Sequence, residues 1–250
     1  MQQVALVTGA ADGLGKIIAC ELLKSGYKVV IADINITHAD STIKSLIETG
    51  QAQPDQLLAV KLDISQEVDY SPALENVIQK WGGVHVVVNN AAMTRTTKVL
   101  DITADEFDEI TAVNQRGTFL SCQFFGRYLA TQGYGRIINM ASLAGQNGGT
   151  ATGAHYAASK GAIITLTKIF AKEFASSGVT VNAISPGPID SPAVHRAVPK
   201  DQLEKIIQSI PVQQLGNATF IGQTIVLLAS KNASFTTGAT WDINGGLFMR

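Results

Sequence analysis

A glycine-rich turn, Thr8-Gly9-Ala10-Ala11-Asp12-Gly13-Leu14-Gly15, joins an apolar run to an amphipathic stretch that extends to Ser25. Glycines at such a junction permit a tight turn and let backbone N–H groups approach a pyrophosphate at the positive end of the following helix. The spacing is G-x-x-x-G-x-G, and its position between strand and helix carries the inference. We therefore predict a dinucleotide site here, with contacts from Gly9, Asp12, Gly13, Leu14 and Gly15.

Short β-branched runs alternate with amphipathic stretches along the rest of the chain. The runs are Val4 to Thr8, Lys28 to Ala32, Leu58 to Leu62, Val84 to Asn89, Arg136 to Met140, Val179 to Ile184 and Gly238 to Ile243. This alternation predicts parallel strands joined by right-handed crossovers and covered on both faces. We expect an α/β fold with a doubly wound, parallel, seven-stranded sheet of the Rossmann type, in three α/β/α layers, with residues 1–250 forming a single domain.

The composition excludes several classes of function. Lys plus Arg number 19 against 20 for Asp plus Glu, so there is no basic surplus to bind nucleic acid. Membrane spans need roughly 18 consecutive apolar residues, and neither such a run nor a secretion signal is present. We expect a cytoplasmic protein. The four histidines share no ligand spacing with Cys20 and Cys122, so no metal is expected.

The region between residues 186 and 211 differs in composition from the rest of the chain, because it contains five prolines. They flank a helical stretch, Asp201 to Ser209. We predict that residues 188–212 form an insertion that moves as a substrate-binding lid. The alternative is a surface loop that does not move.

Asp33 ends the second predicted strand, some 20 residues beyond the glycine turn. A carboxylate there accepts both ribose hydroxyls of an adenosine and repels a 2′-phosphate. At 4 Å and an effective dielectric of 20, one such repulsion is worth roughly 4 kcal/mol. The neighbouring stretch Ile34-Asn35-Ile36 offers no compensating cation, so NAD(H) is favoured over NADP(H).

Tyr156 and Lys160 lie four residues apart at the start of a long apolar helical pattern, and so share one helix face. A phenol can exchange a proton with a substrate hydroxyl if its pKa, ordinarily about 10, is lowered. We expect the Lys160 ammonium and a positively charged nicotinamide ring to lower it. Ser142 follows a predicted strand at the edge where ligands of open α/β sheets bind, and its hydroxyl is placed to hold the oxygen that Tyr156 protonates.

These residues give the chain an end-to-end resemblance to the short-chain dehydrogenase/reductase family. Residues 8–15 resemble its glycine motif, Asp63-Ile64 its adenine contact and Asn89-Asn90-Ala91-Ala92 its central-strand motif. Ser185-Pro186-Gly187-Pro188-Ile189 resembles the motif beside the nicotinamide. The resemblance implies further cofactor contacts at Ile34, Asp63, Ile64, Asn90, Ala91, Ala92, Tyr156, Lys160, Pro186, Gly187, Ile189 and Ser191.

By this resemblance, four residues are catalytic. Tyr156 is the general acid/base, Lys160 lowers its pKa and holds the nicotinamide ribose, and Ser142 orients the substrate. Asn114 interrupts its helix so that a backbone carbonyl holds a water in a proton relay. Substrate contacts are expected from Ser142, Gln146, Tyr156 and Pro188, with His155 as a wall of the pocket.

Three positions depart from the family pattern. Ala92 stands where the family usually has Gly, and Ser191 replaces the commoner Thr while keeping its hydroxyl. The segment between Ser142 and Tyr156 is rich in glycine and slightly long. None of these departures removes a catalytic group.

We thus predict an NAD(H)-dependent oxidoreductase that interconverts a small secondary alcohol and a ketone. An NADPH-dependent 3-oxoacyl-(acyl carrier protein) reductase is the alternative, supported by an ending that resembles this subgroup, Asn244-Gly245-Gly246-Leu247-Phe248-Met249-Arg250, and opposed by Asp33. A cofactor-binding scaffold without turnover is a remote third. Similar proteins are commonly homotetramers, so we expect a homotetramer.

Overall fold

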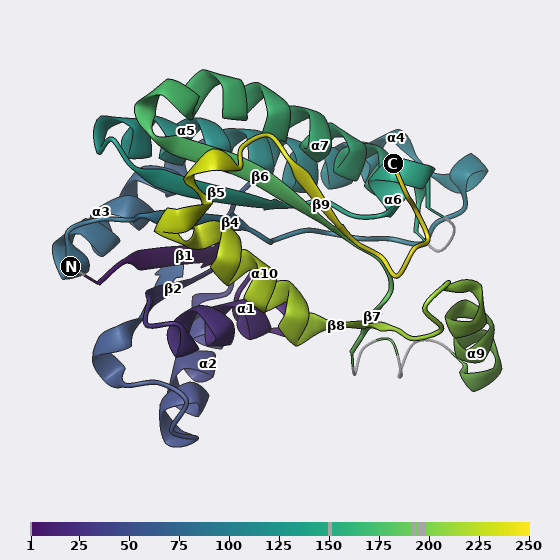
Figure 1. Cartoon of the computed structure of the whole chain (residues 1–250), viewed down its shortest axis with the longest axis horizontal. Helices are drawn as coiled ribbons and strands as arrows, with labels where there is room; N and C mark the ends of the chain where they lie inside the picture. The colour runs from purple at the N-terminus through teal and green to yellow at the C-terminus, as the bar shows by residue number, and fades with distance from the viewer. Residues whose placement is uncertain (1, 150–151, 192–193, 195–198) are drawn as a thin grey trace.

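The computed structural model describes residues 2–149, 152–191, 194 and 199–250, and a seven-stranded sheet forms its centre. All strands of this sheet run parallel, in the order β3-β2-β1-β4-β5-β6-β9 (Figure 1). Their bounds are β1 Val4–Thr8, β2 Lys28–Asp33, β3 Leu57–Lys61, β4 Val86–Asn89, β5 Gly135–Met140, β6 Val179–Pro186 and β9 Thr240–Ile243. The predicted Rossmann-type sheet is confirmed, with strand ends shifted by up to two residues.

Helices cover both faces of the sheet. The α-helices are α1 Gly13–Lys24, α2 Ile36–Glu48, α3 Tyr70–Trp81, α4 Ala104–Ile110, α5 Gly117–Thr131, α6 Ala144–Asn147, α7 Ala154–Phe174, α9 Lys200–Ser209 and α10 Ala218–Ala229. A π-helix, Thr111–Arg116, joins α4 to α5. Short 3-10 turns lie at Pro54–Gln56, Glu67–Asp69, Val99–Asp101, Ala175–Ser177 and Lys231–Phe235. None of the helices in the described part of the chain combines the length and the apolar composition of a membrane span.

Two hydrophobic cores lie on opposite faces of the sheet because successive strand residues point to opposite sides. Ala5 and Val7 of β1 pack with α1, α2 and α10, whereas Val4 and Leu6 pack with α3, α5 and α7. Every residue of β1 and of β4 is buried, as expected for strands covered on both faces. The three-layer prediction is therefore confirmed, and Figure 1 shows α7 above the sheet and α1, α2 and α10 below it.

The topology places the site at the carboxyl edge of the sheet. β1 pairs with β2 on one side and with β4 on the other, so the chain reverses its direction of winding between β1 and β4. Ligands of doubly wound sheets bind in the crevice outside the strand ends at such a switch point. The residues that follow β1, β2, β4, β5 and β6 all meet at this edge.

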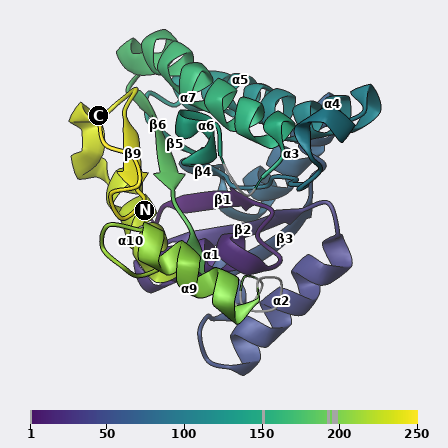
Figure 2. The same cartoon turned by 90° about the vertical axis from the view of Figure 1, so that its right-hand side faces the viewer.

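The proline-rich region stands beyond this edge. It contains the helix α9 and the short strand β7 (Ile189–Asp190). β7 pairs in parallel with β8 (Gly216–Asn217), which follows the region, and the sequence pattern did not predict this small ladder. Figure 2, which faces the edge, shows α9 on the side of α1 and α2, with α4 on the opposite side. Part of the predicted lid, residues 192–193 and 195–198, lies outside the described residues.

Candidate active site

The glycine turn between β1 and α1 has a shape that larger residues cannot adopt. Gly9 has a φ of +61°, and a Cβ there would lie 2.8 Å from the Cα of Ala91. A Cβ on Gly15 would lie 2.6 Å from the side-chain amide of Asn90 and 2.9 Å from the Cα of Ala10. The side chain of Asp12 makes no capping bond, so it does not occupy the N–H groups that open α1.

Asn90 braces the turn from the neighbouring strand. Its side-chain amide donates to the carbonyl oxygens of Thr8, at 2.9 Å, and of Gly9, at 3.1 Å. The hydroxyl of Thr8 in turn accepts the backbone N–H groups of Asn90 and Ala91, both at 3.0 Å. Asn90, a predicted cofactor contact, therefore holds the glycine turn in place through hydrogen bonds to Thr8 and Gly9.

A cavity of about 500 Å³ opens beside this turn. Its walls include eleven of the predicted cofactor contacts: Gly9, Asp12, Leu14, Gly15, Asp33, Ile34, Asp63, Ile64, Asn90, Ala91 and Ala92. Leu62, Met93 and Val113 also line it, and sequence reasoning missed all three. The other seven predicted contacts are not among its lining residues: Gly13, Tyr156, Lys160, Pro186, Gly187, Ile189 and Ser191. The crowded glycine turn and this cavity together fit a dinucleotide.

Asp33 projects its carboxylate against this cavity in a fixed orientation. One oxygen accepts the N–H of Ala11 at 3.2 Å, and the other accepts the N–H of Asn35 at 3.0 Å. Among the described residues that line the cavity there is no Lys or Arg. The negative charge of Asp33 therefore faces the cavity with no lining cation beside it.

The catalytic side chains expected from the sequence converge next to β5. Ser142 follows β5, and its hydroxyl hydrogen-bonds to the phenol of Tyr156 in the first turn of α7. One turn further along α7, the ammonium of Lys160 donates to the carbonyl of Met140 at 2.6 Å and lies 5.6 Å from the centre of the Tyr156 ring. The structure thus brings Ser142, Tyr156 and Lys160 together.

Burial sets the proton affinities of this group. Burial raises the pKa of Tyr156 above its usual value, and the hydrogen bond from Ser142 opposes this only in part. Burial also lowers the pKa of Lys160 to about 8. Among the protein's own groups, burial therefore outweighs the hydrogen bond and raises the pKa of Tyr156, because a phenolate is costly to remove from water. The lowering of this pKa by Lys160 together with a positively charged nicotinamide ring stays a prediction.

Asn114 lies in the middle of the π-helix, so the predicted interruption of its helix is confirmed. Its buried side chain accepts the N–H of Met93 at 2.7 Å and donates to the carbonyl of Met93 at 2.8 Å and to the hydroxyl of Ser159 at 3.1 Å. Its own carbonyl accepts the hydroxyl of Thr118 at 2.7 Å. Asn114 therefore ties the loop after β4 to α7.

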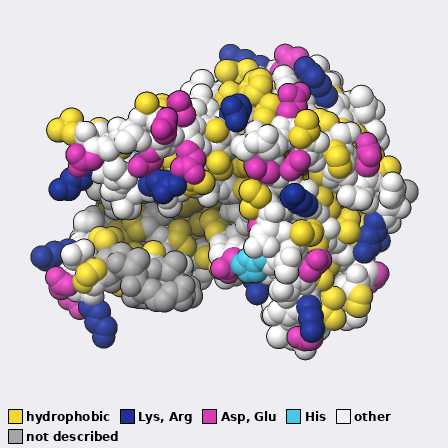
Figure 3. All heavy atoms as spheres, turned by 180° about the vertical axis from the view of Figure 1, so that it is seen from behind, with side chains coloured by type: hydrophobic (Ala, Val, Ile, Leu, Met, Phe, Trp, Pro, Cys, Tyr) yellow, Lys and Arg dark blue, Asp and Glu magenta, His cyan; other side chains and the backbone are white. Residues whose placement is uncertain are grey.

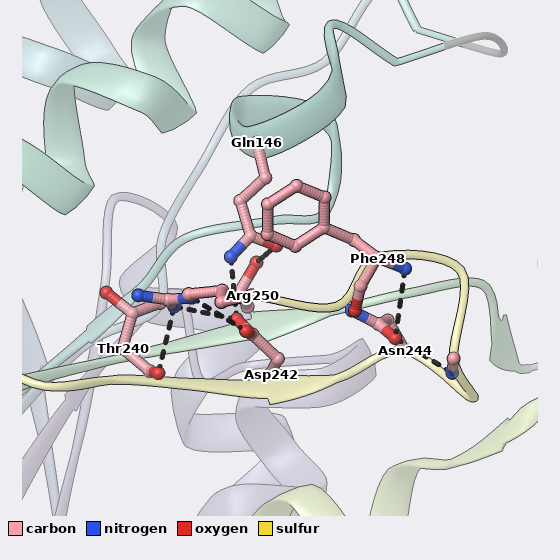
Figure 4. A network of polar contacts seen from close by, with 8 residues as sticks. Gln146, Thr240, Asp242, Asn244, Phe248 and Arg250 are labelled. Atoms are coloured by element: carbon pink, nitrogen blue, oxygen red, sulfur yellow. Dashed lines mark hydrogen bonds and ion pairs between the residues drawn. The ribbon is translucent and has the colours of Figure 1, made fainter.

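Gln146 does not join the catalytic group. Its side-chain amide donates to Asp242 on β9 at 2.6 Å, and its oxygen accepts the hydroxyl of Ser185 on β6 at 2.8 Å. Arg250 holds the same Asp242 carboxylate through two hydrogen bonds of 2.9 Å (Figure 4). Both ends of the amide are engaged, so Gln146 ties α6 to the sheet, and the substrate contact expected of it stays a prediction.

Two other predicted pocket residues have different surroundings. The ring of His155 is fully buried, so it does not form the predicted wall of the pocket. Pro188 lines a separate cavity of about 350 Å³ at the base of α9, together with Ile210 and Ile243. Figure 3 shows the molecule hollowed at its left side in that view, and hydrophobic side chains gather on the walls of the hollow.

Comparisons with known proteins cover nearly the whole chain. A family model described as enoyl-(acyl carrier protein) reductase matches residues 9–248. A 3-oxoacyl-(acyl-carrier-protein) reductase of Staphylococcus epidermidis is 33% identical over 249 residues, covering 100% of both chains. Its counterpart in Thermotoga maritima is also 33% identical, covering 99% of this chain and 98% of its own. A short-chain dehydrogenase/reductase of Armillaria gallica is 36% identical, covering 98% and 95%.

Proposed function

This chain belongs to the short-chain dehydrogenase/reductase family and is an oxidoreductase, and we propose that it interconverts a ketone and a secondary alcohol. The observation that carries the proposal is the convergence of Ser142, Tyr156 and Lys160 at the carboxyl edge of the sheet, the same edge at which the cavity beside the glycine turn opens.

The relatives' names favour the alternative substrate over the leading one. Two of the relatives described above are named 3-oxoacyl-(acyl-carrier-protein) reductase, and their likeness spans the whole chain. A 3-oxoacyl thioester carries a ketone, so its reduction needs the same side chains. We therefore propose 3-oxoacyl thioesters as the first substrate class, and small secondary alcohols as the second.

The chain's own residues handle the oxygen and the proton in this proposal. A bound nicotinamide supplies or accepts the hydride at its C4 carbon. The Ser142 hydroxyl donates a hydrogen bond to the substrate oxygen, and Tyr156 gives that oxygen its proton as negative charge develops on it. The raised pKa of Tyr156 keeps the phenol protonated at neutral pH, which is the state that reduction requires. Lys160 and the braced turn around Gly9 are proposed to hold the cofactor.

Asp33 supports a preference for NADH. Its carboxylate faces the cavity and would oppose a 2′-phosphate as a like charge, a repulsion of roughly 4 kcal/mol at 4 Å and a dielectric of 20. This observation is also what keeps NAD(H)-dependent alcohol oxidation as the second candidate, because the 3-oxoacyl-(acyl carrier protein) reductases generally use NADPH.

Two measurements test the proposed cofactor preference and the proposed reaction. The purified protein is titrated with NADH and NADPH, and turnover is then measured with 3-oxoacyl thioesters and with secondary alcohols. We expect NADH to bind at least about a hundredfold more tightly, equivalent to roughly 2.7 kcal/mol, and Asp33→Asn to narrow that ratio. Tighter binding of NADPH contradicts the role of Asp33. Absence of turnover with every ketone and alcohol contradicts the proposed reaction.

We also propose that residues 188–212 act as a lid over the substrate, with Pro188 among the substrate contacts. Support comes from α9, of which only Leu203 is buried and which stands beyond the strand ends.

A further inference from the structure

His155 is fully buried immediately before the proposed acid/base, Tyr156. Its Nε2 atom lies 2.7 Å from the carboxylate of Glu106 on α4, which is 49 residues earlier in the chain. Its Nδ1 atom accepts the backbone N–H of Tyr156 at 2.9 Å. The imidazole therefore connects α4 directly to the backbone of Tyr156.

The partners determine which nitrogen carries the proton. Nδ1 faces an N–H group, so it must present a lone pair. The proton of a neutral imidazole then sits on Nε2, where it is donated to Glu106. A proton on Nδ1 would point at the N–H of Tyr156, so of the two neutral tautomers these contacts favour the one with the proton on Nε2.

Glu106 departs from the role that its local sequence indicates. The stretch Thr103-Ala104-Asp105-Glu106 has the pattern of a capping box, and the hydroxyl of Thr103 does accept the N–H of Glu106 at 3.2 Å. The Glu106 carboxylate, however, accepts hydrogen bonds from Thr97 and His155. These bonds hold the pKa of Glu106 below its usual range, so it is ionised at neutral pH.

Tyr156 is held at both ends of its backbone. It lies in the first turn of α7, where N–H groups have no partner within the helix, and the His155 ring supplies that partner. On the other side, the hydroxyl of Ser159 donates to the carbonyl of Tyr156 at 2.7 Å and accepts from Asn114 at 3.1 Å. The N–H group of Tyr156 is thus connected to α4 through the His155 ring and Glu106.

We propose that Glu106 is a positioning residue, which acts through the His155 imidazole to hold Tyr156 where its phenol meets Ser142. This inference rests on the proposed function, because it assigns Glu106 to the placement of the proposed proton donor. Glu106 itself touches neither substrate nor cofactor. Its loss is expected to lower turnover while leaving the cofactor cavity intact, since Glu106 is not among the residues lining that cavity.

Four variants on α4 test the proposal, with Glu109 as the matched control. Glu109 lies on the same helix and pairs with Arg95 at 2.7 Å in a half-exposed ion pair that does not involve His155. We expect Glu106→Ala to lower kcat by about 10- to 100-fold, the cost of a misplacement near 1 Å, with KM and the Kd for NADH changed less than about twofold. Glu106→Gln retains an acceptor oxygen and is expected to restore most of kcat, whereas Glu109→Ala and Glu109→Gln leave it unchanged.

A spectroscopic measurement gives a readout that is independent of turnover. With ¹⁵N-labelled histidine, and His155 assigned by its loss in His155→Asn, the imidazole shifts report which nitrogen bears the proton. We expect the Nε2–H form in the parent protein and in Glu106→Gln, and a mixture of forms in Glu106→Ala. If Glu106→Ala does not fold, Glu106→Asp replaces it. The aspartate keeps the negative charge, but its shorter side chain moves the carboxylate away from Nε2 of His155.

The outcomes separate this inference from the proposed function. If the parent protein reduces ketones but Glu106→Ala behaves like Glu109→Ala, the positioning role is wrong. A fall in stability alone, with kcat per folded site unchanged, also overturns it. If the parent protein turns over no ketone or alcohol, the proposed function fails, while the histidine spectra still report whether Glu106 controls the state of His155.

Discussion

Tyr156 sits where its neutral form is favoured. Burial raises the pKa of its phenol, and the only opposing contribution comes from the hydroxyl of Ser142. Lys160, one turn along α7, points its ammonium past the ring to the carbonyl of Met140. The site therefore holds a protonated phenol that can act as a proton donor. Replacing Tyr156 by a residue without the hydroxyl tests this assignment.

Tyr156→Phe is expected to reduce turnover by roughly 10² to 10⁴, the usual contribution of a positioned general acid. The ring keeps its volume, so the melting temperature and the Kd for NADH should stay close to those of the parent protein. Steady-state kinetics with a 3-oxoacyl thioester, beside NADH titration, measure both. Tyr134→Phe serves as the control, and near-normal turnover of Tyr156→Phe would falsify the proposed proton transfer.

Lys160 gives stability a specific dependence on pH. Its pKa is about 8 in the folded protein and 10.5 in a solvated side chain. Between these values the unfolded chain binds more protons, so the free energy of unfolding should rise as pH increases from about 8 to about 10.5. At lower pH the buried charge makes the fold less stable.

Urea unfolding at several pH values, compared with Lys160→Met, measures this effect. The pKa of the buried Cys122 thiol is raised to about 12, so its contribution to stability falls above pH 9 and opposes that of Lys160. Subtracting the curve of the variant removes Cys122 and the tyrosines, because both proteins contain them. If the difference in the free energy of unfolding between the two proteins does not change with pH, the lowered pKa of Lys160 is contradicted.

Among the structural elements, the β1–α1 turn has little room for a larger residue. A Cβ on Gly15 would press against the Asn90 amide that braces the turn and against the Cα of Ala10. We expect Gly15→Ala to weaken NADH binding by about tenfold or more, equivalent to ~1.4 kcal/mol, since the backbone must move. Fluorescence titration measures this loss.

Gly50→Ala is the matched control for that variant. Unlike Gly15, Gly50 has a positive φ, of +70°, and nothing lies within 4 Å of an added Cβ, so a substitution there adds backbone strain without crowding. The control should lower stability by roughly 1–2 kcal/mol through backbone strain and leave the NADH affinity unchanged. Equal effects of both variants on NADH affinity contradict the proposed role of the turn.

For the whole molecule, one face carries apolar residues in contact with solvent. Phe119 on α5 is 38% exposed and Ile169 on α7 is 54% exposed, and the two helices pack side by side on the same face of the sheet (Figure 1). We predict that this face contributes to the homotetramer expected from the family resemblance.

Sedimentation of the parent protein and of Ile169→Asp tests the prediction. A charge at this exposed position should leave the fold intact but shift the protein to a smaller species, because it places an unpaired carboxylate in the contact. A parent protein that sediments as a monomer contradicts the assembly.

Local patterns of residues were enough to predict most of the secondary structure and the glycine turn. The seven strands, the helix that begins at Gly13 and the glycine turn follow from periodicity and from backbone conformations that only glycine adopts readily. The placing of Ser142, Tyr156 and Lys160 at one edge was also predictable, since parallel strands end at the same side of a sheet.

The contacts between side chains that are distant in the sequence could be identified only in the folded chain. Glu106 and His155 are 49 residues apart, and Gln146 and Asp242 are 96 apart, so no local spacing indicates either pair. The raised pKa of Tyr156 likewise depends on how many distant residues exclude water from its ring. Hydrogen-bond partners and desolvation arise from packing between elements, and a one-dimensional pattern carries no record of that packing.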